Sequence, residues 1–215
     1  MKDTRLDINS KNKNGSTPFH LACINGHLAI LEILIKDIRL KINSKDNDGN
    51  TGFHYACKNG HLAIVDFLIK DAQPASLSLE INSKNKYSWT PFHLACLYGH
   101  LAIVDFLMKD AHLKINSRNN YGWTPFHFAC NYGINEIISL FLNSNIQSTQ
   151  EYFGYRTGTT SYDILKEKNI NLDPVKEKIS KNEKLIFYAA DGDLSELKYL
   201  LQRKKLNYIL TKYFY

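Results

Sequence analysis

The chain has 215 residues, 44% of them hydrophobic and 22% charged, and its formal net charge at pH 7 is +6. Such a composition supports a packed core and is ordinary for a soluble protein. Lysine and arginine alternate with acidic residues along the sequence, so there is no basic stripe of the kind that nucleic-acid binding usually needs, and nucleic acid is not an expected partner.

The beginning of the chain carries no secretory signal, because Met1 to Asn14 is polar. The longest apolar stretches, such as residues 28–35, include an acidic residue and are far shorter than the ~20 residues of a membrane span. We therefore expect a soluble protein with no membrane span. Its expected location is the cytoplasm, with the nucleus as an alternative, or the host-cell cytosol if the source is an intracellular parasite.

One unit is written four times in this sequence. The copies begin at Ile8, Ile42, Ile81 and Ile115, so successive copies are offset by 34, 39 and 34 residues. A fixed period in this range indicates an array of stacked repeats. Because such arrays present an extended surface, the repetition favours binding over catalysis.

The first unit predicts a turn followed by two helices. Residues 11–15 are turn-forming, and Thr17-Pro18 is a helix start in which threonine caps free amides and proline needs no partner for an N–H. Gly26 ends this short helix, because glycine accepts the left-handed conformation. Apolar residues at helical spacing over 28–35 then predict a second, longer helix. Neither helix buries its apolar side alone, so each unit must stack on the next.

Four cysteines occupy the same place in each unit, at positions 23, 57, 96 and 130. Stacked helices lie ~8–10 Å apart, whereas a disulfide needs Cα atoms within ~7 Å. We therefore expect reduced, buried thiols. The spacing His20-x2-Cys23-x3-His27 also resembles a metal-ligand pattern. The intervening glycine separates these side chains, and Ile134 replaces the third residue in the last copy, so no metal and no cofactor are predicted.

The block Thr17-Pro18-Phe19-His20-Leu21-Ala22-Cys23, followed by Asn25-Gly26-His27, resembles the ankyrin repeat, whose signature is T-P-L-H-x-A. This resemblance implies an all-α solenoid of stacked helix-turn-helix units with projecting turns. This sequence departs from the family pattern in two ways. Asp37, Asp71 and Asp110 stand where the family usually has glycine after the second helix, and we expect them to adopt left-handed geometry. Gly52 replaces the usual proline and should weaken its helix start.

We expect four well-formed repeats over residues 1–145, at 8–41, 42–80, 81–114 and 115–145. The third begins five residues late because of an insertion at 73–77, which we interpret as a surface loop. Residues 146–215 are interpreted as degenerate fifth and sixth repeats or as a C-terminal cap. The aromatic segment 208–215 fits no cap: either it folds back on the last helices, or the chain is a fragment of a longer array.

The resemblance also implies where a partner would bind, because ankyrin repeats commonly meet partners through the turn tips and the exposed side of the first helices. These positions are mostly polar in repeats one and two but mostly aromatic or apolar in repeats three and four. Aromatic residues are enriched at binding hot spots. A competing interpretation is that the rings stack between adjacent turns and only add stability. The predicted partner-binding residues are Tyr87, Trp89, Leu97, Tyr98, Tyr121, Trp123 and Tyr132.

No catalytic constellation is present in the sequence. It has no Gly-rich phosphate loop followed by lysine and no G-x-S-x-G element. We expect a non-enzymatic, monomeric adaptor or scaffold that binds another protein. The alternative is the regulatory or targeting part of a larger enzyme whose catalytic domain is absent from this chain.

Overall fold

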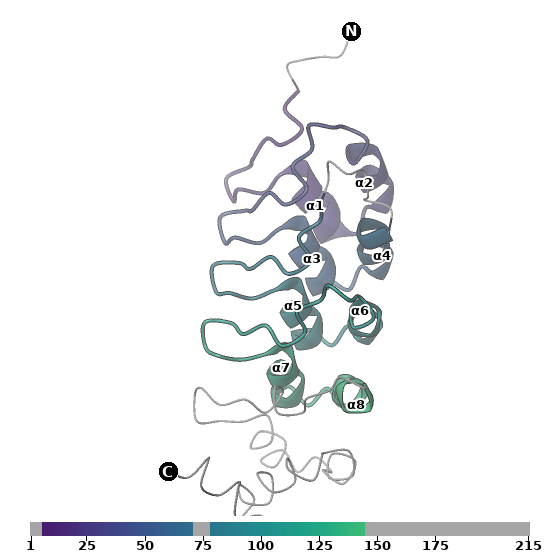
Figure 1. Ribbon diagram of the computed structural model, residues 1–215. Coiled ribbons are helices and arrows are strands. Elements are labelled where there is room, and N and C mark those ends of the chain that lie inside the picture. Colours follow the sequence, from purple (N-terminus) through teal and green to yellow (C-terminus); the bar gives the residue numbers. More distant parts are fainter. Residues whose placement is uncertain (1–5, 71–77, 145–215) are drawn as a thin grey trace, which may run out of the picture.

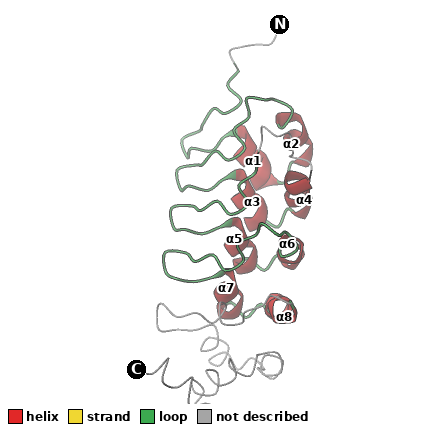
Figure 2. Cartoon of the chain, viewed as in Figure 1, coloured by secondary structure: helices red, strands yellow, loops and turns green. Residues whose placement is uncertain are grey.

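The computed structural model describes residues 6–70 and 78–144, and within these ranges the chain is helical without any strand (Figures 1 and 2). Two helices belong to each unit. In chain order they are α1 (Pro18–Asn25), α2 (Leu28–Leu34), α3 (Gly52–Lys58), α4 (Leu62–Lys70), α5 (Pro91–Leu97), α6 (Leu101–Leu107), α7 (Pro125–Asn131) and α8 (Asn135–Asn143).

The helices form two parallel rows, and the loops between units project to one side as a row of fingers (Figure 1). The inner row contains α1, α3, α5 and α7, in which α1 packs on α3, α3 on α5 and α5 on α7, and the outer row contains α2, α4, α6 and α8. This arrangement confirms the predicted all-α solenoid with projecting turns. The expected greater length of the second helix is wrong for the first unit, where α1 has 8 residues and α2 has 7, and for the third unit, where α5 and α6 both have 7.

Every inner helix begins with the same Thr-x-x-His arrangement. Thr17 is the N-cap of α1, and its Oγ1 accepts the backbone N–H of His20 at 3.4 Å. In return the backbone N–H of Thr17 donates to His20 Nδ1 at 3.2 Å. This is a capping box with histidine in the place usually held by Glu or Gln. Thr51 and His54 form the same box in α3, so this helix start is complete although Gly52 has replaced proline.

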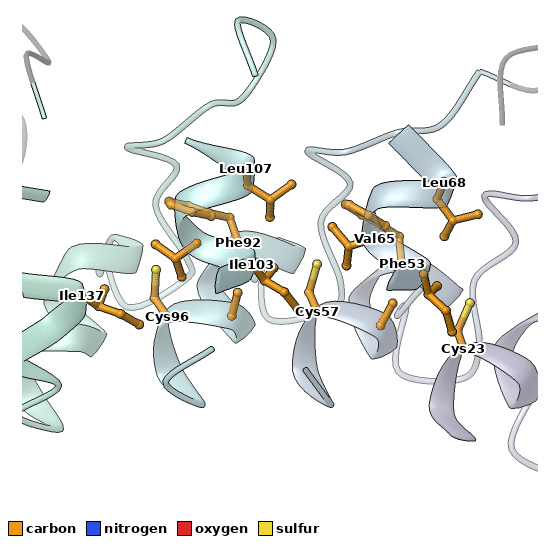
Figure 3. Close-up of a cluster of buried hydrophobic side chains, with 14 of the residues drawn as sticks. Cys23, Phe53, Cys57, Val65, Leu68, Phe92, Cys96, Ile103, Leu107 and Ile137 are labelled. Carbon is orange, nitrogen blue, oxygen red and sulfur yellow. The ribbon is translucent and has the colours of Figure 1, made fainter. Parts of the chain in front are cut away.

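The core runs without interruption through the stack (Figure 3). Each inner helix contributes one phenylalanine that is at most 1% exposed and one cysteine that is fully buried. Aliphatic residues of the outer helices, such as Val65 and Ile103, close the core from the other side. The cysteines are free thiols, as predicted, and burial raises their pKa above the ordinary range. They fill space as small apolar side chains.

Each finger turns around one Asn or Asp side chain. Asn85 Oδ1 accepts the backbone N–H groups of Tyr87 and Trp89, both at 3.0 Å, and residues 12, 46 and 119 do the same in the other fingers. Neighbouring fingers are joined by single backbone bonds, such as Lys86 N–H to Asp48 C=O at 3.0 Å. The row of fingers is therefore a hydrogen-bonded frame.

The Asn-Ser-Lys sequence at the start of units one, two and three joins each of these units to the next. Asn82 Nδ2 donates to His112 C=O, and Asn82 Oδ1 accepts Lys114 N–H, both at 2.8 Å. Two residues later, Lys84 Nζ donates to Arg118 C=O at 2.9 Å. Equivalent bonds link units one to two and two to three. The recurrence of these polar residues thus has a structural cause.

One local expectation needs correction. Asp37 and Asp110 do not adopt left-handed geometry, since Ser88 is the one non-glycine residue with positive φ in the described part of the chain. Each aspartate instead accepts the backbone N–H two residues on, which stabilises the turn after an outer helix. At Gly52, a Cβ atom would lie 2.6 Å from the Phe19 ring. The missing side chain therefore makes room for a core phenylalanine.

Two predictions concern residues outside the described ranges. They are the surface-loop insertion at 73–77 and the degenerate repeats or cap at 146–215. Asp71, the third aspartate expected to be left-handed, also lies outside these ranges.

Candidate functional site

Four tyrosines of units three and four project from the finger side of the stack. Tyr87 and Tyr121 lie at the finger tips and are 53% and 62% exposed, and Tyr98 and Tyr132 lie at the ends of the inner helices and are 50% and 60% exposed. The equivalent positions in units one and two hold asparagine or aspartate. Two pairs of tyrosines on neighbouring units therefore give this half of the array an exposed aromatic surface.

The two tryptophans are half-buried and share one partner. Both pack against Phe128 of α7, with ring centroids 4.6 Å away for Trp89 and 5.1 Å for Trp123. Each indole also lies beside the histidine of its own unit, at 6.4 Å for Trp89 and His93. Aromatic pairs at these separations add stability beyond burial alone. The tryptophans thus form the floor of the surface, and the tyrosines form its exposed edge.

Phe128, which is not among the residues predicted from the sequence, holds this floor together. Phe128 is the fourth residue after the capping threonine, a position occupied by Leu21 in the first unit and by Leu94 in the third. Leu21 is 43% exposed, whereas Phe128 is only 6% exposed because the two indoles cover it. The signal available in the sequence was the variable position between histidine and alanine in the T-P-L-H-x-A block, where Phe128 stands. Leu97, the remaining predicted residue, is half-buried at the end of α5.

A cavity of about 760 Å³ opens between the third and fourth fingers and α7. This volume lies within the range of sites that hold a drug-sized ligand or a side-chain cluster. The cavity brings together four of the seven predicted residues and leaves Tyr87, Leu97 and Tyr98 outside its lining. Its lining consists of Trp89, Arg118, Asn119, Asn120, Tyr121, Gly122, Trp123, Phe128 and Tyr132.

Two buried N–H donors in this lining have no acceptor in the described part of the chain. They are Trp89 Nε1 and Asn119 Nδ2. In the preceding unit the equivalent amide, Asn85 Nδ2, donates to Asn50 Oδ1 at 2.9 Å. Trp89 stands at the position of Asn50, so the acceptor that Asn119 would have used is missing. A buried donor without a partner costs roughly 1–3 kcal/mol.

The finger beside Trp89 is strained at one residue. Ser88 has φ of 59°, and the corresponding residue is glycine in the other three fingers, with φ between 76° and 81°. A side chain in this left-handed region costs about 1–2 kcal/mol. Backbone strain of this kind is concentrated at functional sites, and here it lies between two residues of the aromatic surface.

The recurrent histidines and cysteines form hydrogen bonds and core contacts. His54 Nε2 lies 3.1 Å from Trp89 C=O in the next unit, and His93 Nε2 lies 3.1 Å from Trp123 C=O. His61 and His100 reach back instead, to carbonyl groups of the preceding inner helix at 3.0 Å and 2.8 Å. Over residues 6–70 and 78–144, no three His, Cys, Asp or Glu side chains converge as metal ligands would.

The histidines of the capping boxes are held in the neutral form. Burial lowers the pKa of His54, His93 and His127 to about 4, and it lowers the pKa of His20 as well. A neutral ring accepts at Nδ1 from the threonine N–H and donates from Nε2–H to the carbonyl of the next unit. The rings of His20, His54 and His93 therefore each join two units.

Comparison with known protein families gives one clear match. The family model described as ankyrin repeats (3 copies) matches residues 3–78 and again residues 75–151. No curated protein matches the chain. Separately, none of the helices in the described ranges is long and apolar enough to cross a membrane.

Proposed function

Because this chain belongs to the ankyrin-repeat family, we propose that it is an adaptor or scaffold that binds a partner protein through the finger side of repeats three and four. Ankyrin repeats generally mediate protein–protein interaction and are typically non-catalytic. The binding surface in this proposal is the aromatic surface, meaning Tyr87, Tyr98, Tyr121 and Tyr132 together with the floor of Trp89, Trp123 and Phe128.

The observation that carries the proposal is the contrast between equivalent positions of one chain. Repeats one and two build the same fingers and inner helices with Asn14, Asn25, Asp48 and Asn59 at the four places where repeats three and four have tyrosine. The fold therefore does not need tyrosine there. Exposed tyrosines supply large contact area at low cost in side-chain entropy, and they are common in binding surfaces.

Stacking between neighbouring turns accounts for the tryptophans but not for the tyrosines. The indoles are half-buried against Phe128, so they stabilise repeats three and four whether or not a partner is bound. The four tyrosines are at least half exposed. Contact with a partner would remove this apolar area from water, which is favourable by roughly 25 cal/mol per Å².

The test uses the chain's own residues as substitutions. All four tyrosines are replaced by asparagine, the residue present at positions 14, 25 and 59. Wild-type and variant protein are immobilised, and partners captured from the lysate of the source cells are quantified by mass spectrometry. We expect at least one protein to be captured by the wild type and reduced by at least about tenfold with the variant.

A matched control removes an exposed apolar side chain elsewhere. Ile33 is 70% exposed and belongs to α2, a helix of the outer row (Figure 1). Ile33→Asn should capture the same partner as the wild type. Equal capture by the four-tyrosine variant and the wild type would refute the proposed surface.

A further inference from the structure

We propose that the aromatic surface recognises an acidic segment of its partner, which inserts one bulky apolar side chain into the cavity floored by Trp89, Trp123 and Phe128. This inference rests on the proposed function and adds the chemistry of the partner. Three features of the described residues support it: the charge of the surface, its unpaired donors and its apolar floor.

The charged residues in the fingers and inner helices that build this surface are all basic. Residues 81–100 and 115–134, which contain the fingers and inner helices of repeats three and four, include Lys84, Lys86 and Arg118 but no aspartate or glutamate. The same stretch of repeat two, residues 42–61, contains both Asp46 and Asp48. In addition, Lys58 Nζ lies 5.6 Å from the centre of the Tyr98 ring. Complementary charge makes an acidic segment the matching partner.

The hydrogen-bonding groups of the cavity match the same ligand. Only 6% of the surface of Asn119 is exposed, and its Nδ2 has no acceptor among the described residues. Trp89 Nε1, which also belongs to the lining, has none either. Both groups can only donate in these positions. A ligand bearing carboxylate or backbone carbonyl oxygens would supply acceptors, whereas a basic side chain would add more unpaired donors.

The floor of the cavity requires an apolar group beside the acidic ones. Phe128 and the two indoles form one continuous ring cluster, with centroid separations of 4.6 Å and 5.1 Å. The cavity volume of about 760 Å³ exceeds what a single aromatic side chain fills, so the flanking backbone fits as well. Aromatic rings without a neighbouring cation would also bind a cationic group. Here the positive charge of Arg118 in the lining would repel such a group.

Single-stranded nucleic acid is the rival ligand, since it also combines negative charge with flat rings. It binds best where aromatic faces are free to stack and where cations follow the backbone. Here the indoles already pack on Phe128, and the two repeats together contribute three cations on this side. These observations favour a protein segment.

The test exploits the fact that Trp89 and Trp123 are the only tryptophans of the chain. Their fluorescence therefore reports on this cavity in the full-length protein. The probes are synthetic peptides with a central phenylalanine flanked by glutamate, by glutamine or by lysine, and a glutamate peptide with serine at the centre. We expect saturable binding of the glutamate–phenylalanine peptide, at least about fivefold tighter than any other peptide and weakened by added salt.

Lys86 and Lys13 provide a matched pair of charge variants. They occupy the same position in fingers three and one, and each backbone carbonyl accepts a side-chain amide from the next finger. Lys86→Glu should weaken the acidic peptide by at least about fivefold, whereas Lys13→Glu should leave its affinity unchanged.

The inference is overturned if the neutral or basic peptide binds equally well, or if a single-stranded oligonucleotide binds more tightly than the acidic peptide. No saturable signal from the acidic peptide up to about 1 mM would also overturn it. The proposed function would still stand in each case if partner capture required the four tyrosines. Capture that does not depend on them refutes the proposed function itself.

Discussion

At the scale of single residues, one histidine decides how closely two repeats approach. Gly60 has φ of +77°, and a Cβ atom placed on it would lie 2.7 Å from the His100 ring. Gly99 has nearly the same φ, +75°, but the next repeat has Ile134 in place of histidine, and the nearest atom is 3.6 Å away. Comparing alanine substitutions at these two glycines therefore separates the cost of backbone strain from the cost of steric contact.

We predict that Gly99→Ala costs about 1–2 kcal/mol, the strain of left-handed backbone alone. Gly60→Ala should cost more by about 1 kcal/mol, because its methyl group displaces His100 from the 2.8 Å bond to Lys58 C=O. Urea unfolding monitored by circular dichroism measures both. Equal losses of stability would show that the histidine contact is not a constraint.

A substitution at Ser88 should change the free energy of unfolding in the opposite direction. Replacing it with glycine removes the left-handed strain at φ of 59°, although glycine also makes the unfolded chain more flexible. We expect Ser88→Gly to raise the free energy of unfolding by about 0.5 kcal/mol. Differential scanning calorimetry should show a higher Tm, and a lower Tm would mean that the serine side chain stabilises the finger.

At the scale of elements, the capping-box histidines link the stability of the stack to pH. The folded protein holds His54, His93 and His127 with pKa values of about 4, against 6.5 for a free side chain. Between these values the unfolded chain binds more protons, so stability rises with pH. The contribution of each histidine to stability is fully present above pH ~6.5. It is lost as the pH falls toward 4, and the loss is up to roughly 3 kcal/mol for each histidine.

We predict that the free energy of unfolding falls between pH 6.5 and pH 5, and that His93→Gln makes this dependence shallower. Urea titrations at several pH values give the slopes. A slope that is the same for wild type and His93→Gln would contradict the account of a buried neutral ring.

The helices could be predicted from the sequence because their signals are local. Thr17-Pro18 and Gly26 mark the two ends of α1, and the structure has Thr17 as N-cap and Gly26 as C-cap. The bonds between repeats could not be predicted in the same way. Asn82 resembles an ordinary turn residue, and its two partners lie 30 and 32 residues away.

The candidate site was only partly predictable for a similar reason. The exposure of the four tyrosines follows from their place in the repeat, which the sequence fixes by register. The burial of the indoles depends on Phe128, which comes from a different part of the sequence. The residue at the equivalent position of the first repeat, Leu21, is 43% exposed. Burial on a finger surface is set by the combination of side chains, and no single repeat contains that combination.

At the scale of the whole molecule, the stack is a rigid support for a surface that differs along its length. Inner helices pack in an unbroken row from α1 to α7, and bonds between fingers hold the turns in register. Arrays of this kind keep the fold while the exposed positions vary. Repeats one and two present polar fingers, and repeats three and four present aromatic ones.

The central claim is therefore about location: the partner binds on the finger side of repeats three and four. Hydrogen exchange of the full-length protein, with and without the captured partner, tests this most directly. We predict that binding slows exchange in residues 85–99 and 119–133, with little change at 28–34 and 62–70. Protection confined to the outer helices, or to the fingers of repeats one and two, would contradict the account.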